Sequence, residues 1–234
     1  MLSGGRLSAP TVATTRGEVW VVRDGTSVVR VQAGGSPQAV ATPTLQSLGP
    51  AQAFQLSPDG TRAALVVEGP SGPGLYIGTV VRADDGSVAV RDFRAIAPEL
   101  TRVTDVAWRD SGSLLVLAGD LAEGRVVPYS VGVDGWGLAE ISQSGLPSEP
   151  RSVAAAPTRQ PLVDAGGTIW QLTGGPGPRW SEDASPFPGW RPSTRSDDDR
   201  RPQEKDHRKD PVLLTTRGLA ASLRTEPFEL TGPR

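Results

Sequence analysis

The sequence Ala53-Phe-Gln-Leu-Ser-Pro-Asp-Gly-Thr-Arg-Ala-Ala-Leu-Val-Val67 is typical of two β-strands joined by a tight turn. In the Ser-Pro-Asp-Gly turn, Pro58 fixes φ and Gly60 supplies the positive φ that reverses the chain. Two further strand-like segments follow at residues 74–81 and 87–93, separated by an Asp-Asp-Gly turn. Four antiparallel strands within about 50 residues form one blade of a β-propeller.

The same pattern recurs along the chain. Residues 105–118 repeat the strand–turn–strand unit, a weaker copy spans residues 152–172, and another lies within residues 10–41. The spacings between the corresponding turns are 43, 52 and 48 residues, close to a propeller period, and the turn positions are Gly17, Gly60, Gly112 and Gln160. Turn spacing alone leaves an immunoglobulin-type sandwich open, but the recurrence at about fifty residues favours blades.

The sequence therefore predicts an all-β domain over residues 1–189, built as a β-propeller of about four four-stranded blades. The blades are expected at residues 1–49, 50–100, 101–147 and 148–189. Because the first blade begins abruptly, we expect an incomplete ring. Propellers close their ring to avoid exposed edges, so a chain with an open edge should self-associate when it is expressed alone.

Residues 190–234 differ from the rest in charge. Charged side chains make up 18 of these 45 residues but only 32 of the preceding 189. A segment of this kind has little to bury, so we predict a mostly disordered tail with a short helix at residues 211–223. A lineage-specific extension and a shifted reading frame would both account for such a tail.

Composition excludes several classes of function. The 234-residue chain has a formal net charge of −2, so binding of nucleic acid through broad electrostatic attraction is not expected. It contains no Cys, its single His is His207 in the tail, and no apolar run approaches the roughly 18 residues of a membrane span. Neither a Gly-x-Ser-x-Gly elbow nor a Ser-x-x-Lys pair occurs. We therefore expect no catalytic residues, cofactor or metal.

Four Asp-Gly pairs repeat through the domain, at Asp24, Asp59, Asp85 and Asp134. Carboxylates gathered around a propeller channel would suit Ca²⁺, but these pairs lack the dense Asp-x-Asp-x-Asp spacing of a calcium loop. Asp-Gly is also a strong hairpin signal. We interpret the pairs as turn residues.

The chain has six tryptophans, Trp180 and Trp190 among them, and the other four divide into two groups. Trp20, Trp108 and Trp170 lie on expected strands, where aromatic side chains fill the space between blades. Trp136 lies between two glycines in a turn and is the candidate contact residue for a partner. Five arginines at strand ends and on outer strands are interpreted as a solvated β surface rather than a basic contact patch: Arg82, Arg91, Arg94, Arg102 and Arg109.

Several motifs, taken in order, resemble the C-terminal β-propeller of LpqB-type actinobacterial lipoproteins. They are Gly17-Glu-Val-Trp20, the run from Phe54 to Val67, Leu75-Tyr-Ile-Gly-Thr-Val-Val-Arg82, Val103-Thr-Asp-Val-Ala-Trp-Arg-Asp110, Val153-Ala-Ala-Ala-Pro157 and Phe187-Pro-Gly189. The resemblance covers about residues 1–189. The Ser-Pro-Asp-Gly turn alone is shared with many TolB-like propellers, and the ordered series is more specific.

The resemblance implies a lipid-anchored extracytoplasmic protein in which a pair of GerMN-like modules precedes the propeller, so the anchor is expected outside this chain. It also implies a partner, the extracytoplasmic region of a two-component sensor histidine kinase of the MtrB type, and a role in envelope homeostasis and cell division. The expected function is non-enzymatic protein recognition. The alternative is a propeller enzyme acting on carbohydrate or lactone substrates, which would show carboxylates clustered at one mouth of the channel.

Overall fold

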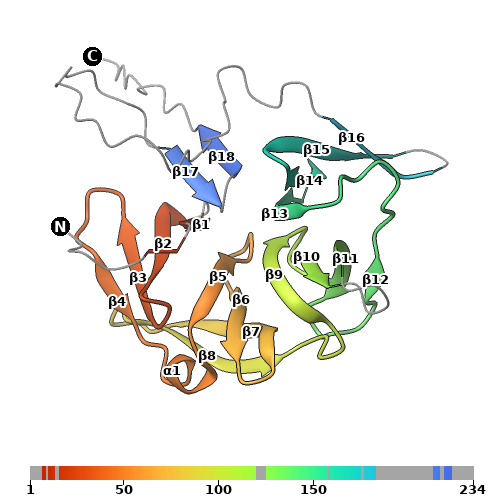
Figure 1. The fold of residues 1–234 in the computed structure, drawn as a ribbon. Coiled ribbons are helices and arrows are strands. Elements are labelled where there is room, and N and C mark those ends of the chain that lie inside the picture. The colour runs from red at the N-terminus through yellow and green to blue at the C-terminus, as the bar shows by residue number, and fades with distance from the viewer. Residues whose placement is uncertain are drawn as a thin grey trace, which may run out of the picture.

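The computed structural model describes residues 7–8, 10–13, 16–119, 125–157, 159–174, 177–182, 213–216 and 219–222. Four antiparallel sheets of four strands follow one another along the chain. In Figure 1 they lie around a common axis with the first strand of each sheet innermost. The prediction of an all-β propeller with four four-stranded blades is confirmed.

Each sheet is formed by consecutive strands. The first sheet holds β1 (Thr11–Ala13), β2 (Glu18–Arg23), β3 (Ser27–Gln32) and β4 (Gln38–Val40), and the second holds β5 (Ala51–Leu56), β6 (Arg62–Gly69), β7 (Gly72–Arg82) and β8 (Val88–Ala95). The third holds β9 (Thr101–Trp108), β10 (Ser113–Gly119), β11 (Val126–Gly132) and β12 (Ala139–Glu140), and the fourth holds β13 (Pro150–Ala156), β14 (Arg159–Ala165), β15 (Thr168–Thr173) and β16 (Arg179–Glu182). The short helix α1 (Leu45–Leu48) links the first two sheets.

The tail differs from its prediction where the structure describes it. In place of a helix at residues 211–223, β17 (Leu213–Thr216) and β18 (Leu219–Ser222) form an antiparallel pair that contacts β13. Two consecutive β-branched residues, Thr215 and Thr216, favour a strand over a helix there. The disorder predicted for the remainder of residues 190–234 lies outside the described residues.

Equivalent residues pair in the same way in all four sheets, so the two faces of one sheet can be compared with those of the others. The front face of a sheet is turned to the following sheet, and its central pairs on the first two strands are Thr11–Trp20, Ala53–Val66, Asp105–Leu117 and Ser152–Asp164. The rear face is turned the other way, and its central pairs are Val12–Val19, Phe54–Leu65, Val106–Val116 and Val153–Val163. The two sets alternate because successive side chains of a strand point to opposite faces.

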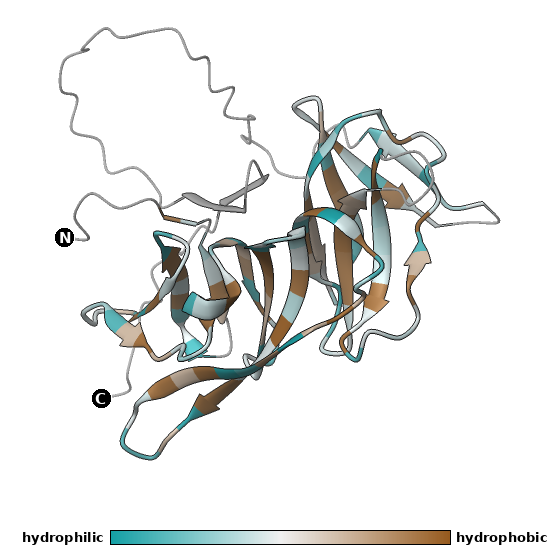
Figure 2. Ribbon diagram, turned by 60° about the horizontal axis from the view of Figure 1, so that its bottom comes forward, coloured by the Kyte–Doolittle hydropathy of each residue, from teal (hydrophilic) through white to brown (hydrophobic). Residues whose placement is uncertain are grey.

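The core consists of three hydrophobic clusters, one at each joint between consecutive sheets. At the first joint Trp20 packs with Phe54 and Leu65, and at the third joint Leu117 packs with Val153. The second joint brings Ala53 and Val66 against the rear face of the third sheet. Figure 2 shows the hydrophobic residues concentrated in the strands and the hydrophilic ones mostly in the connecting turns.

Backbone hydrogen bonds also join the first two sheets. Ala41, just after β4, pairs with Ala89 of β8 in a parallel bridge. The N–H of Ala41 donates to the carbonyl of Val88 (3.0 Å), and the N–H of Val90 donates to the carbonyl of Ala41 (2.8 Å). At the opposite end of the joint, the N–H of Ala51 donates to the carbonyl of Gly25 (2.7 Å). Backbone hydrogen bonds thus connect the two sheets at their outer strands and at the turn between β2 and β3.

One predicted turn is displaced. Gln160 was expected at the turn of the fourth blade, but it lies inside β14, and the chain turns at Pro157. Proline has no N–H to donate to a strand ladder, so β13 ends before it. Among the described residues, no helix has the length and apolar character needed to cross a membrane.

Candidate functional site

Trp136, the candidate contact residue, lies in the turn between β11 and β12. Its side chain is 79% exposed, the most exposed of the large apolar side chains that the structure describes. Burying an aromatic ring of this size in a partner contributes more to binding than most other side chains. Trp136 therefore stays the candidate contact residue.

The turn that carries Trp136 is held in one conformation. The Asp134 Oδ1 atom accepts a hydrogen bond from the N–H of Trp136 (3.0 Å), and the N–H of Gly132 donates to the carbonyl of Trp136 (2.8 Å). Gly135 and Gly137 take φ values of +90° and +68°, which residues with a Cβ rarely adopt. The two glycines that marked this residue in the sequence are thus required by the turn.

Neighbouring segments brace the same turn. The N–H of Val133 donates to the carbonyl of Gly112 (3.0 Å), and the Arg94 guanidinium donates through Nη2 to the carbonyl of Val133 (2.7 Å). Arg94 belongs to the second sheet, so this bond ties the Trp136 turn to the neighbouring sheet. A side chain on a braced turn loses little conformational entropy on binding.

The Asp-Gly pairs act as turn residues. Asp85 Oδ1 accepts from the N–H of Ser87 (2.8 Å), and Asp59 Oδ1 accepts from the hydroxyl of Ser57 and the N–H of Thr61. At the first pair both central residues have positive φ, as a type I′ hairpin requires: Asp24 (+53°) and Gly25 (+75°). The described residues include no group of three or more Asp, Glu, His or Cys side chains that is suited to hold a metal ion.

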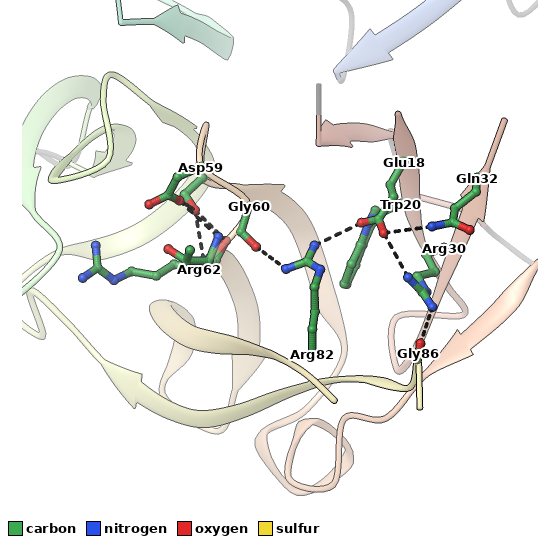
Figure 3. Close-up of polar contacts among 11 residues, drawn as sticks. Glu18, Trp20, Arg30, Gln32, Asp59, Gly60, Arg62, Arg82 and Gly86 are labelled. Atoms are coloured by element: carbon green, nitrogen blue, oxygen red, sulfur yellow. Dashed lines mark hydrogen bonds and ion pairs between the residues drawn. The ribbon is translucent and has the colours of Figure 1, made fainter. Parts of the chain in front are cut away.

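A buried charge cluster lies at the first joint, centred on Glu18 (Figure 3). Glu18 is 2% exposed, and its Oε1 accepts from Arg30 Nη1 (2.9 Å) while its Oε2 accepts from Arg82 Nη2 (3.0 Å) and Trp20 Nε1 (3.1 Å). Gln32 Nε2 completes the shell at 3.5 Å. A buried carboxylate is tolerated only when it is paired and hydrogen-bonded in this way.

Turn carbonyls anchor the two arginines of this cluster. Arg82 donates through Nη1 to the carbonyl of Gly60 (2.7 Å), and Arg30 donates through Nη2 to the carbonyl of Gly86 (2.7 Å). Both glycines belong to Asp-Gly turns, which gives those turns a second role. The cluster therefore links side chains of the first sheet to turns of the second.

Arg82 corrects an interpretation made from the sequence. It was expected on a solvated β surface, but its side chain is only 19% exposed and ion-pairs with Glu18 of the preceding sheet. The guanidinium carbon also lies 5.9 Å from the centroid of the Trp20 ring. Burial alone would raise the pKa of Glu18, but hydrogen bonds from Arg82, Trp20 and Arg30 together outweigh it and hold the pKa below its ordinary value.

The strand tryptophans occupy the predicted positions between sheets. Trp20 is fully buried and stacks on Phe54, with ring centroids 6.2 Å apart and planes at 12°. Trp108 is buried and donates through Nε1 to the carbonyl of Gln55 (3.0 Å). Trp170 packs against the cluster of the third joint, which also contains Trp180. Trp190 lies outside the described residues.

The innermost strands of the four sheets carry one carboxylate side chain. Asp105 is the carboxylate of the four innermost strands, and it is buried, accepting from the N–H groups of Val106 (2.9 Å) and Val153 (3.1 Å). An open pocket at the outer rim of the first two sheets is lined by β3, β4, Arg23 and Arg91, and no carboxylate lines it.

Solved structures share this fold. A catalytically inactive virginiamycin B lyase from Staphylococcus aureus, solved with quinupristin, superposes with a TM-score of 0.50 and 16% sequence identity, covering 81% of this chain and 59% of that chain. At this identity the likeness concerns the fold alone.

Relatives of known family were found at the sequence level. The chain is 28% identical over 172 residues to lipoprotein LpqB of Corynebacterium diphtheriae, covering 70% of this chain and 28% of that protein. It is 31% identical over 150 residues to lipoprotein LpqB of Thermobifida fusca, covering 62% and 22%. The chain thus spans less than a third of the length of these relatives. The sequence model of the "Lipoprotein LpqB beta-propeller domain" family matches residues 1–200, and the chain therefore belongs to that family.

Proposed function

We propose that this propeller is a non-enzymatic protein-recognition module of an LpqB-like envelope lipoprotein. The single observation that carries the proposal is Trp136, a 79% exposed aromatic side chain on a turn fixed by its own hydrogen bonds and by Arg94. Exposed aromatic side chains on rigid loops are the usual anchors of protein interfaces.

The described polar residues support recognition over catalysis. Glu18 and Asp105 are the buried carboxylates with the most hydrogen bonds, and both serve joints between sheets. Their partners are arginines and backbone N–H groups, which is the pattern of structural rather than reactive acids.

The proposed partner is the extracytoplasmic region of a two-component sensor histidine kinase, and the proposed role is in envelope and division homeostasis. Support comes from membership of the LpqB propeller family and from the name lipoprotein that the relatives carry. That name also supports an extracytoplasmic, membrane-anchored location for the full-length protein.

The test is a binding titration of the full chain against the purified extracytoplasmic region of the kinase from the same bacterium. We expect Trp136→Ala to weaken binding at least tenfold, because an interface aromatic contributes about 2 kcal/mol or more. Val81→Ala serves as the matched control, since Val81 is 39% exposed and lies in β7 of the second sheet, away from the Trp136 turn. Equal dissociation constants for Trp136→Ala and the unmodified chain would contradict the assignment of the contact.

The enzymatic alternative is tested separately on the same preparation. Turnover of a panel of lactones and oligosaccharides is measured for the unmodified chain, where we expect no rate above background. Turnover that is abolished by substitution of a single carboxylate would contradict the non-enzymatic proposal.

A further inference from the structure

The rear face of the first sheet differs in burial from the rear faces of the other three sheets. Its central pair, Val12–Val19, is only partly buried. The equivalent pairs of the other sheets are at most 2% exposed and lie in the clusters between sheets: Phe54–Leu65, Val106–Val116 and Val153–Val163. The apolar rear face of the first sheet is therefore only partly buried among the described residues, whereas the rear face of each other sheet packs on the preceding sheet.

Five valines lie on this face, which we call the valine face: four are partly buried, and Val29 is buried at 6% exposure. Val19 and Val21 alternate along β2 with residues that point to the second sheet, and the ladder places Val31 and Val29 opposite them. Val12 of β1 completes the set: Val12, Val19, Val21, Val29 and Val31. Beside them Leu7 is 47% exposed and pairs with Arg23, which ends the face. No carboxylate lies on the valine face.

The front face of the fourth sheet is its structural counterpart. Ala154–Leu162 and Ser152–Asp164 occupy the register positions that Ala107–Leu115 and Asp105–Leu117 hold in the third sheet. In the third sheet those positions pack on the following sheet. The fourth sheet thus repeats the backbone register of the face that packs on a following sheet, with Asp164 (8% exposed) at the position of Leu117.

Ser152 marks this front face as incomplete. Its hydroxyl oxygen is fully buried and has no hydrogen-bond partner in the structure. At the equivalent positions, Thr11 Oγ1 accepts from the N–H of Leu56 (3.1 Å) and Asp105 Oδ2 accepts from the N–H of Val153 (3.1 Å), each on the next innermost strand. A buried hydroxyl without a partner is costly, and the repeat indicates that a following innermost strand would satisfy it.

We propose that the two faces bind each other between copies of this chain, the front face of the fourth sheet of one copy packing on the valine face of another. This head-to-tail contact reproduces the joint that occurs three times within the chain. The incoming innermost strand donates an N–H to Ser152, and it takes the place of the β17–β18 pair that contacts β13 in a single chain. Such a contact is heterologous, because each copy uses two different surfaces.

The test compares two single variants of the full chain by sedimentation velocity across a concentration series. Val21→Glu places a charge on the valine face, and Leu162→Glu places one on the front face of the fourth sheet. For the unmodified chain we expect the average mass to rise with concentration. Each variant should associate at least tenfold more weakly with itself, because burying an unpaired charge opposes packing.

The mixture of the two variants is the decisive measurement. Each variant retains one intact face, so an equimolar mixture should form a dimer of one copy of each and grow no further. Val81→Glu, at an exposed position outside both faces, should associate like the unmodified chain. Circular dichroism and a cooperative melt establish that every variant is folded.

Three results would overturn the proposal. The first is an unmodified chain that stays monomeric at all concentrations. The second is a mixture that stays monomeric, which would show that the β17–β18 pair or another segment keeps the front face covered. The third is loss of association in Val21→Glu but not in Leu162→Glu, which would show valine face packing on valine face. If Val21→Glu fails to fold, Val21→Thr is used in the same mixture with the same three criteria.

Discussion

The first and third joints of the propeller have the same backbone register and different chemistry. The first joint contains a buried ion cluster around Glu18 and a stack of Trp20 on Phe54. The third joint is made mostly of apolar residues such as Leu117 and Val153. Its polar contacts include Asp105, which accepts from the N–H of Val153, and Trp180, whose Nε1 donates to the carbonyl of Ser142 (2.8 Å). The repeated strands thus fix the geometry of a joint, whereas the side chains that fill it are free to differ. It also predicts that the two joints respond differently to the loss of one group.

The largest effect is expected at the first joint. Glu18→Ala leaves Arg30 and Arg82 partly or fully buried without their carboxylate, so we expect the free energy of unfolding to fall by about 3–5 kcal/mol. Urea denaturation followed by tryptophan fluorescence measures the change. Glu99→Ala, at an exposed position, is the control and should stay within about 0.5 kcal/mol. A loss of under about 1 kcal/mol for Glu18→Ala would show that the cluster does not hold this joint.

Acid should weaken the same joint. Because the folded pKa of Glu18 lies below its ordinary value, the stability from this carboxylate is complete above the unfolded pKa and is lost as pH falls through the folded pKa. The turn carboxylates Asp59, Asp85 and Asp110 also have lowered pKa values, so their contributions to stability are likewise lost as the pH falls.

The contribution of Glu18 to this pH dependence is isolated by comparison with Glu18→Gln. Urea midpoints measured from about pH 7 to about pH 3 should fall more steeply for the unmodified chain than for Glu18→Gln. Parallel curves would contradict the assigned pKa.

A smaller effect is expected at the third joint. Asp105→Ala leaves the N–H of Val153 buried without its acceptor, which costs about 1–3 kcal/mol. Asp105→Asn keeps an acceptor oxygen and should recover part of the loss. The same urea experiment distinguishes the two variants, and equal losses for Ala and Asn would show that the hydrogen bond is not what matters at this position.

The smallest effect on stability is expected at Trp136. Its side chain is 79% exposed, so Trp136→Ala should change the free energy of unfolding by less than about 0.5 kcal/mol. A larger loss would mean that the ring stabilises its own turn and would weaken its use as a probe of binding.

Sequence reasoning succeeded where structure is local. The Ser57–Gly60 turn joins two strands that are adjacent in the sequence and pair directly with each other. Trp136 lies between two glycines of its turn and is exposed, as the sequence suggested. Contacts between sheets were not accessible in the same way, because Glu18 and Arg82 lie 64 residues apart and meet only through the register of two sheets. A charged residue at a strand end carries no local signal that distinguishes a buried ion pair from a solvated surface. The sequence indicated turns and strands, therefore, but not the chemistry of the joints.

The bridge between Ala41 and Ala89 makes the opening of the first joint observable. Through it the ladders of the first two sheets run into each other as one continuous hydrogen-bonded ribbon. The amide protons of Ala41 and Val90 are shielded only while the two sheets remain side by side. Their hydrogen-exchange rates therefore report the separation of these sheets from one another, and exchange at these two amides that is faster than within either sheet would show that the joint opens first.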